Sequence, residues 1–124
     1  MSKIVLVTGA SSGIGKAVAT FLSDKGFKVY GTSRAPKNEK DFSFEMIALD
    51  VLKIETIKMA VNFIIEKEGR LDILVNNAGI GVTGPIEETP TDEMRNAFNT
   101  NFFGAVDVIK TVLPFMRTQK YGVI

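Results

Sequence analysis

The segment that most constrains this chain is the glycine-rich stretch Thr8–Gly15, TGASSGIG. It follows Ile4–Val7, a continuous apolar run that predicts a strand buried on both faces, as in parallel sheets. Gly9 permits a tight turn, Gly13 a close approach of the backbone to a ligand, and Gly15 close packing of a helix on the strand. The stretch therefore predicts a turn that leads into a helix N-terminus, whose free N–H groups and positive potential suit a phosphate.

The rest of the chain alternates between strand and helix patterns. Strands are predicted at 27–32, 44–49 and 71–75, and helices at 13–25, 54–68 and from about 91 to about 119. This alternation predicts right-handed crossovers and an α/β fold with a doubly wound parallel sheet, Rossmann-like, formed by one domain over residues 1–124. Tyr121–Ile124 starts like a fifth strand and stops, so we expect the unit to be incomplete, truncated near the start of that strand.

Several local features carry more detailed expectations. Ile14 and Phe21 belong to the apolar stripe expected to face the sheet from the first helix, and Asn101 lies on the corresponding stripe of the long helix. We therefore expect a buried Asn101 amide that must find hydrogen-bond partners. Thr89 or Thr91 is the expected N-cap of the long helix, and Pro114 should kink it or begin its end. The polar residues 33–41 predict a loop.

Composition excludes several classes of function. Fifteen basic and fourteen acidic side chains give a net charge of +1. The chain therefore lacks the excess of basic residues that is typical of proteins that bind nucleic acids or membranes electrostatically. The chain has no Cys and no His, which excludes disulfides, His/Cys metal sites and catalysis by either residue, and we expect no metal site. The apolar run at the N-terminus is too short for a signal peptide or a membrane span, so we expect a soluble, cytoplasmic protein.

The pair Gly15-Lys16 resembles the end of a P-loop, in which a lysine reaches nucleotide phosphates. Five residues separate Gly9 from Gly15, whereas the P-loop has four, and Ala17 stands where a Ser or Thr would ligate magnesium. We therefore regard a phosphate-transferring NTPase as a remote alternative.

Two segments and two single residues match motifs of the short-chain dehydrogenase/reductase family. The glycine loop fits that family's TGxxxGxG pattern, and Asn76–Gly79, after the predicted fourth strand, fits its NNAG segment. Asp50 directly follows the third strand, and Asn101 lies in an Asn-Phe-Phe-Gly context typical of the family. The chain therefore resembles this family over essentially its whole length. The glycine-loop positions that carry the match are Thr8, Gly9, Gly13 and Gly15.

The resemblance implies an oxidoreductase that reduces a carbonyl or oxidises a secondary alcohol of a small-molecule substrate with a nicotinamide cofactor. In the family, the residue that matches Asp50 contacts the adenine ring, and the one that matches Asn101 is an active-site residue that organises a water beside a catalytic lysine. The other residues expected at the cofactor are Thr8, Gly9, Ser11, Ser12, Gly13, Ile14, Gly15, Ser33, Arg34, Val51, Asn77, Ala78 and Gly79.

The choice between NAD and NADP depends on the end of the second strand, where an acidic side chain would bind a free ribose 2′-hydroxyl. This chain has Thr32-Ser33-Arg34 there and no carboxylate. Arg34 can pair with a 2′-phosphate through charge-assisted hydrogen bonds, and Ser33 can donate another. We therefore expect NADP rather than NAD.

The family completes its active site with a Ser and a Tyr-x-x-x-Lys pair that this sequence does not contain: Tyr30 is followed four places later by Arg34, and Tyr121 lies three residues from the end. The alternative interpretation is thus a non-catalytic nucleotide-binding or interaction module. The family commonly dimerises through its long helix. Since the outer side of that helix carries Phe103, Val106 and Ile109, we expect a homo-oligomer.

Overall fold

A computed structural model describes residues 2–36 and 41–124. The elements alternate as the sequence predicts, apart from a π-helical segment inside the long helix. In chain order they are β1 (Ile4–Val7), α1 (Gly13–Asp24), β2 (Lys28–Ser33), β3 (Glu45–Ala48), α2 (Ile54–Glu68), β4 (Ile73–Val75), α3 (Thr91–Phe98), the π-helix η2 (Asn99–Gly104) and α4 (Ala105–Gln119). Residues 37–40 of the predicted polar loop lie outside the described residues.

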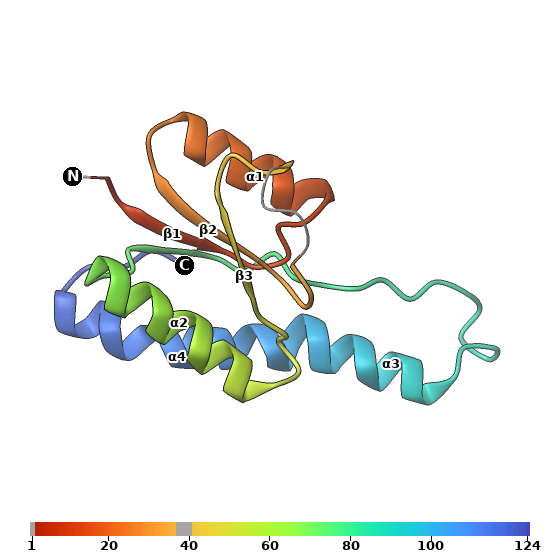
Figure 1. The fold of residues 1–124 in the computed structure, drawn as a ribbon. Helices are drawn as coiled ribbons and strands as arrows, with labels where there is room; N and C mark the ends of the chain where they lie inside the picture. The colour runs from red at the N-terminus through yellow and green to blue at the C-terminus, as the bar shows by residue number, and fades with distance from the viewer. Residues whose placement is uncertain (1, 37–40) are drawn as a thin grey trace.

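The four strands form one parallel sheet in the order β3-β2-β1-β4. β1 lies inside the sheet, where Val5 pairs with Val29 of β2 on one side and with Ile73 of β4 on the other. Helix α1 covers one face of the sheet, and α2 and α4 cover the other (Figure 1). This arrangement confirms the predicted doubly wound parallel fold. All four residues of β1 are buried, because helices cover both faces of the strand.

Each face of the sheet has its own apolar core. Between the sheet and helices α2 and α4, the core includes Leu6, Tyr30, Ile57, Ile64, Val108 and Val112. Between the sheet and α1, it includes Val5, Val7, Ala19, Val29 and Phe44. Alternate residues of β1 thus supply both cores, which fixes the height and tilt of the helices that surround the carboxyl ends of the strands.

Residues 121–124 run beside β4, on the side away from β1. The Val123 N–H donates to the Asp72 carbonyl at 3.0 Å, and the Leu74 N–H donates to the Val123 carbonyl at 2.9 Å. These bonds form a single parallel bridge between Ile73 and Val123. The last residues therefore begin to pair as the sequence predicts for a fifth strand.

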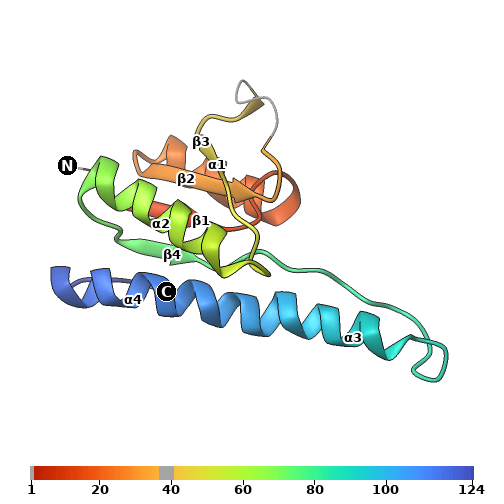
Figure 2. The ribbon, with the colours of Figure 1, turned by 60° about the horizontal axis from the view of Figure 1, so that its bottom comes forward.

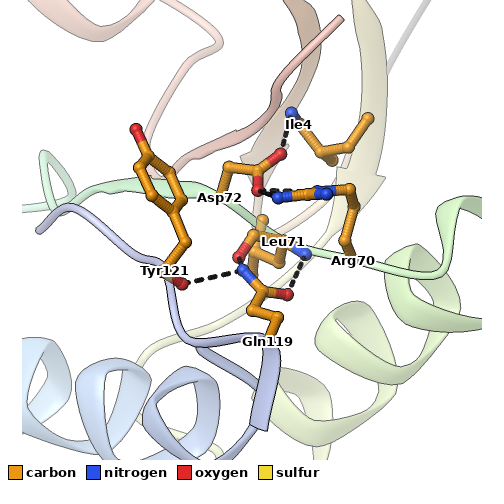
Figure 3. A network of polar contacts seen from close by, with 6 residues as sticks. All are labelled: Ile4, Arg70, Leu71, Asp72, Gln119 and Tyr121. Carbon is orange, nitrogen blue, oxygen red and sulfur yellow. Dashed lines mark hydrogen bonds and ion pairs between the residues drawn. The ribbon is translucent and has the colours of Figure 1, made fainter. Parts of the chain in front are cut away.

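A polar network ties together the amino ends of β1 and β4 and the end of α4 (Figure 3). The buried Asp72 carboxylate accepts a bond from the Ile4 N–H at 2.8 Å and is paired with the Arg70 guanidinium. The Gln119 side chain donates to the Leu71 carbonyl at 2.6 Å and to the Tyr121 carbonyl at 2.9 Å. The network fixes this end of the sheet with polar contacts, at the opposite end of the strands from the glycine turn.

The face that α1 turns toward the sheet differs from the expected one. Ile14 and Phe21 are exposed, and the buried residues of this helix are Gly15 and Ala19. A Cβ at Gly15 would collide with the Gly9 carbonyl oxygen and the Asn77 amide nitrogen. The helix therefore approaches the strands along its smallest side chains, and the larger apolar ones lie beside that contact.

The long helix departs from prediction at its start and middle. Pro90, not Thr89 or Thr91, occupies the N-cap position, because the Thr89 hydroxyl donates instead to the Pro85 carbonyl within the preceding turn. The helix also continues past Pro114 to Gln119, so the proline does not begin its end. None of the helices in the described part of the chain is both long and apolar enough to cross a membrane.

Candidate functional site

A cavity of about 480 Å³ opens where the parallel strands end, at the edge of the sheet where doubly wound folds bind ligands. Four segments contribute to its wall: the glycine turn after β1, the end of β2, and the segments that follow β3 and β4. The expected site residues that line it are Gly9, Ser11, Ser12, Ile14, Ser33, Arg34, Asp50, Val51, Asn77, Ala78 and Gly79. The structure thus brings together, around one cavity, residues that span 70 positions of the sequence.

The glycine turn leaves the N-terminus of α1 without a side-chain cap. Gly9 and Gly13 have φ angles of +65° and +59°, which side chains other than glycine rarely adopt. Ser12 is the N-cap residue, but its hydroxyl makes no capping bond, and the first turn contains no acidic side chain. The amide groups that open α1 are therefore suited to an anion.

Thr8 does not line the cavity but connects two of its loops. Its buried hydroxyl accepts hydrogen bonds from the N–H groups of Asn77, at 3.0 Å, and Ala78, at 2.9 Å. The Asn77 side chain donates in turn to the carbonyls of Thr8 and Gly9, at 3.1 and 3.0 Å. These four bonds fix the glycine turn against the NNAG segment. Gly13 and Gly15 do not line the cavity either: Gly15 is buried against Gly9 and Asn77, and Gly13 is exposed in the turn.

The end of β2 contains an unsatisfied hydroxyl in a residue that lines the cavity. Ser33 Oγ is buried and has no hydrogen-bond partner among the described residues. Leaving a buried polar atom without a partner costs about 1–3 kcal/mol, so such an atom in a cavity wall indicates a ligand that satisfies it. The next residue, Arg34, is exposed at the same wall. The pair together can hold an anionic group.

Asp50 organises the turn between β3 and α2. Its carboxylate accepts a bond from the Leu52 N–H at 2.9 Å, and its own N–H donates to Thr56 Oγ1 at 2.9 Å. Helix α2 begins at Ile54, and its N-cap residue, Lys53, makes no side-chain capping bond. The Thr56 hydroxyl, in the first turn of α2, bonds to the N–H and the carbonyl of Asp50, and these bonds hold Asp50 and Val51 at the cavity rim.

Asn101 lies outside the cavity wall and is exposed, which contradicts the buried position expected from helical spacing. The π-helical turn of η2 causes the difference, because its wider i→i+5 turns shift the buried stripe to Thr100 and Gly104. The amide does find partners, as expected. Its Oδ1 accepts from the Ile80 N–H at 2.8 Å, and its Nδ2 donates to the Ile80 carbonyl at 2.7 Å.

Sequence reasoning left out six residues of the cavity wall: Thr32, Leu49, Leu52, Ile80, Asn96 and Thr100. Thr32, Leu49, Leu52 and Ile80 are sequence neighbours of expected residues. Asn96 and Thr100 are four positions apart, so they share one face of the long helix. No local pattern shows that this face lies over the carboxyl ends of the strands, because that placement depends on how the helix packs against the sheet.

The family model described as short chain dehydrogenase matches residues 3–124. A 3-ketodihydrosphingosine reductase of Bacteroides thetaiotaomicron is 46% identical over 122 residues, which cover 98% of this chain and 45% of that protein. The crystal structure of a short-chain dehydrogenase from Streptomyces avermitilis superposes with a TM-score of 0.91 at 38% identity, covering 99% of this chain and 48% of that one. The NADP-bound structure of ElxO gives 0.92 at 36% identity, covering 99% and 54%.

The fold and these matches define a Rossmann-like protein of the dehydrogenase type. The chain belongs to the short-chain dehydrogenase family. It spans about half the length of the curated relatives that it matches.

Proposed function

We propose that this chain is the cofactor-binding part of an NADP(H)-dependent oxidoreductase that reduces a carbonyl or oxidises a secondary alcohol. The observation that carries the proposal is the cavity of about 480 Å³ at the carboxyl ends of the strands. It combines an uncapped helix N-terminus, a buried hydroxyl without a partner and an exposed arginine. A dinucleotide with an additional phosphate satisfies all three.

Each part of the cavity suits one part of such a cofactor. The amides that open α1 would bind the pyrophosphate, Ser33 and Arg34 the 2′-phosphate, and Asp50 and Val51 the adenine. Ala78 and Gly79 would line the nicotinamide side, where the bound cofactor supplies or accepts a hydride. The NADP-bound neighbour supports the choice of NADP over NAD.

For the whole protein we propose a small-molecule carbonyl or alcohol as substrate and a homo-oligomeric state. Asn101 would act as an active-site residue that holds the loop after β4 next to the nicotinamide side, through its two bonds to Ile80. The exposed rings of Phe102 and Phe103 on the long helix offer an apolar surface to a second copy.

Isothermal titration with NADPH and NADH tests the cofactor assignment. NADPH should bind more tightly than NADH, and Arg34→Ala should weaken NADPH binding by about tenfold to hundredfold, because a charge-assisted hydrogen bond contributes about 1.5–3 kcal/mol. Arg34→Asp should reverse the preference, because a carboxylate repels the phosphate and accepts bonds from a free ribose hydroxyl.

Arg117→Ala is the matched control, because Arg117 is an exposed arginine on α4 that does not line the cavity. It should leave both dissociation constants unchanged. Tighter binding of NADH by the unsubstituted protein, or an unchanged NADPH affinity in Arg34→Ala, would overturn the assignment to NADP. If the protein bound neither NADPH nor NADH, the proposed function would be overturned.

A further inference from the structure

A second cavity, of about 360 Å³, lies between the loop that follows β4 and helix α3. In Figure 2 this loop extends beyond the sheet and returns to the start of α3. The cavity wall contains no charged side chain among the described residues. Most of its side chains are apolar: Ile80, Val82, Ile86, Met94, Ala97 and Phe98.

The polar side chains in this wall already have partners within the protein. The Asn101 amide bonds through both of its polar atoms to Ile80, and the Thr89 hydroxyl donates to the Pro85 carbonyl at 2.8 Å. Ile86 and Phe98, by contrast, are 83% and 67% exposed. An uncharged, apolar occupant would therefore remove apolar surface from water without costing a polar group its partner.

The second cavity adjoins the cofactor cavity. Ile80 lines both, and Gly79, in the wall of the cofactor cavity, lies beside Asn101, in the wall of the second one. The two bonds from Asn101 fix the backbone of Ile80 between them. A molecule that occupies the second cavity would thus reach the nicotinamide side of the proposed cofactor site.

A second copy of the chain suits a different surface. On the other side of Phe98 the long helix forms a separate hollow, lined in part by Arg95, Asn99 and Phe103. That hollow is lined by residues of the long helix alone and contains the cation of Arg95, whereas the cavity between loop and helix is uncharged and shares Ile80 with the cofactor cavity. The position and chemistry of the second cavity favour a substrate over a protein partner.

We infer that the substrate is a ketone or secondary alcohol with an uncharged apolar chain, and that this chain binds between Ile80, Ile86 and Phe98. The inference rests on the proposed function, because it places the reacting carbon at Gly79 and Ile80, where the two cavities meet. It adds the substrate class: apolar chains are favoured, and chains that end in a charged group are excluded.

Binding of unbranched methyl ketones to the protein saturated with NADP⁺ tests this inference, because the oxidised cofactor cannot reduce the ketone. From 2-butanone to 2-nonanone, each additional methylene should strengthen binding roughly fourfold until the cavity is filled. A ketone of the same length with a terminal carboxylate should bind more weakly than its uncharged counterpart.

Ile86→Asp should abolish the dependence on chain length and leave NADP⁺ affinity unchanged, because Ile86 does not line the cofactor cavity and its exposure makes the substitution tolerable for folding. Met59→Asp is the matched control, since Met59 is an exposed apolar residue on α2, 71% accessible, and should change neither measurement. Phe98→Ser, from the opposite wall, should repeat the effect of Ile86→Asp.

The outcomes separate the two proposals. If the unsubstituted protein did not bind NADP⁺, both the proposed function and this inference would be overturned. Normal NADP⁺ binding with no dependence on ketone length, or equal binding of the carboxylated ketone, would overturn the inference alone. Light scattering that showed Ile86→Asp dissociating an oligomer would assign the cavity to a second copy and would also overturn it.

Discussion

Thr8 shows how a single side chain can build the candidate site without touching a ligand. Its hydroxyl is buried at the end of β1 and accepts two backbone N–H groups from the NNAG segment. Valine has nearly the same shape but cannot accept these bonds, so the substitution would leave two N–H groups without their acceptor. The hydroxyl therefore matters both for stability and for the distance between two loops of the cofactor cavity.

We expect Thr8→Val to lower the free energy of unfolding by about 1–3 kcal/mol and to weaken NADPH binding. Thr8→Ser, which keeps the acceptor, should retain most of the stability and most of the affinity. Urea denaturation and titration calorimetry measure the two effects. A larger loss in the serine variant than in the valine variant would show that the methyl group, and not the hydroxyl, holds the loops together.

At the residue level, the sequence predicts which positions surround the cavity better than it predicts what each one does. Pattern and spacing identify Gly9, Ser33 and Asp50, because each lies within two residues of the end of a predicted strand. They do not show that Thr8 and Gly15 stand behind the wall. That distinction depends on contacts with Asn77, more than sixty residues away in the chain.

At the level of elements, strands are predicted well because an apolar run between helices is buried on both faces whatever its exact register. The buried face of a helix depends on packing. Gly15 turns α1 away from its apolar stripe, and η2 shifts the stripe of the long helix from Asn101 to Thr100. Neither the closest approach of two backbones nor a π-helical turn has a distinct signature in hydrophobic spacing.

The π-helical segment η2 presents Asn101 to the loop after β4. Since that amide forms the two hydrogen bonds that hold Ile80, Asn101→Ala should release the loop. We expect the Ile80 amide to exchange with solvent about tenfold to hundredfold faster in this variant, as one or two hydrogen bonds are lost. Hydrogen exchange followed by NMR measures the change.

Asn99→Ala is the control for this prediction. Asn99 is an exposed asparagine in the same segment, but it lines the hollow that contains Arg95 and Phe103 and not the second cavity. Its replacement should leave the exchange of the Ile80 amide unchanged. Faster exchange in both variants would mean that η2 itself unwinds, and the assignment of the effect to the Asn101 amide would be wrong.

At the scale of the whole molecule, the two ends of the sheet differ in structure: one end opens into cavities and the other is held by polar contacts. The carboxyl ends of the strands open into cavities. Glycines in the wall of the cofactor cavity allow a ligand to approach the backbone, and the Ser33 hydroxyl there has no hydrogen-bond partner among the described residues. The amino ends of β1 and β4 are tied together by the carboxylate of Asp72, which holds Ile4 and Arg70. Strong polar contacts at one end allow the other to keep groups free for a ligand.

Burial of Asp72 disfavours its charged form, but the hydrogen bonds from Arg70 and from the Ile4 N–H outweigh that effect and lower the pKa of the carboxyl below its ordinary value. A carboxyl with a lowered pKa in the folded state stabilises the fold above the pKa it has in the unfolded chain. That contribution disappears as the pH falls through the folded-state pKa. The sheet should therefore loosen at its amino end in acid.

Comparison of the native chain with Asp72→Asn isolates this contribution, because the other carboxyl groups titrate in both proteins. At about pH 7 the free energy of unfolding of the variant should be about 1–3 kcal/mol lower than that of the native chain. An amide cannot replace the charged carboxylate that accepts from the Ile4 N–H and the Arg70 guanidinium. The difference should shrink as the pH falls below the pKa of an aspartate in the unfolded chain, about 3.9, and through the lower folded-state pKa of Asp72. Urea denaturation across this range measures it, with the exposed Asp24→Asn as control. A difference that stays constant with pH would mean that Asp72 acts through shape and not through its charge.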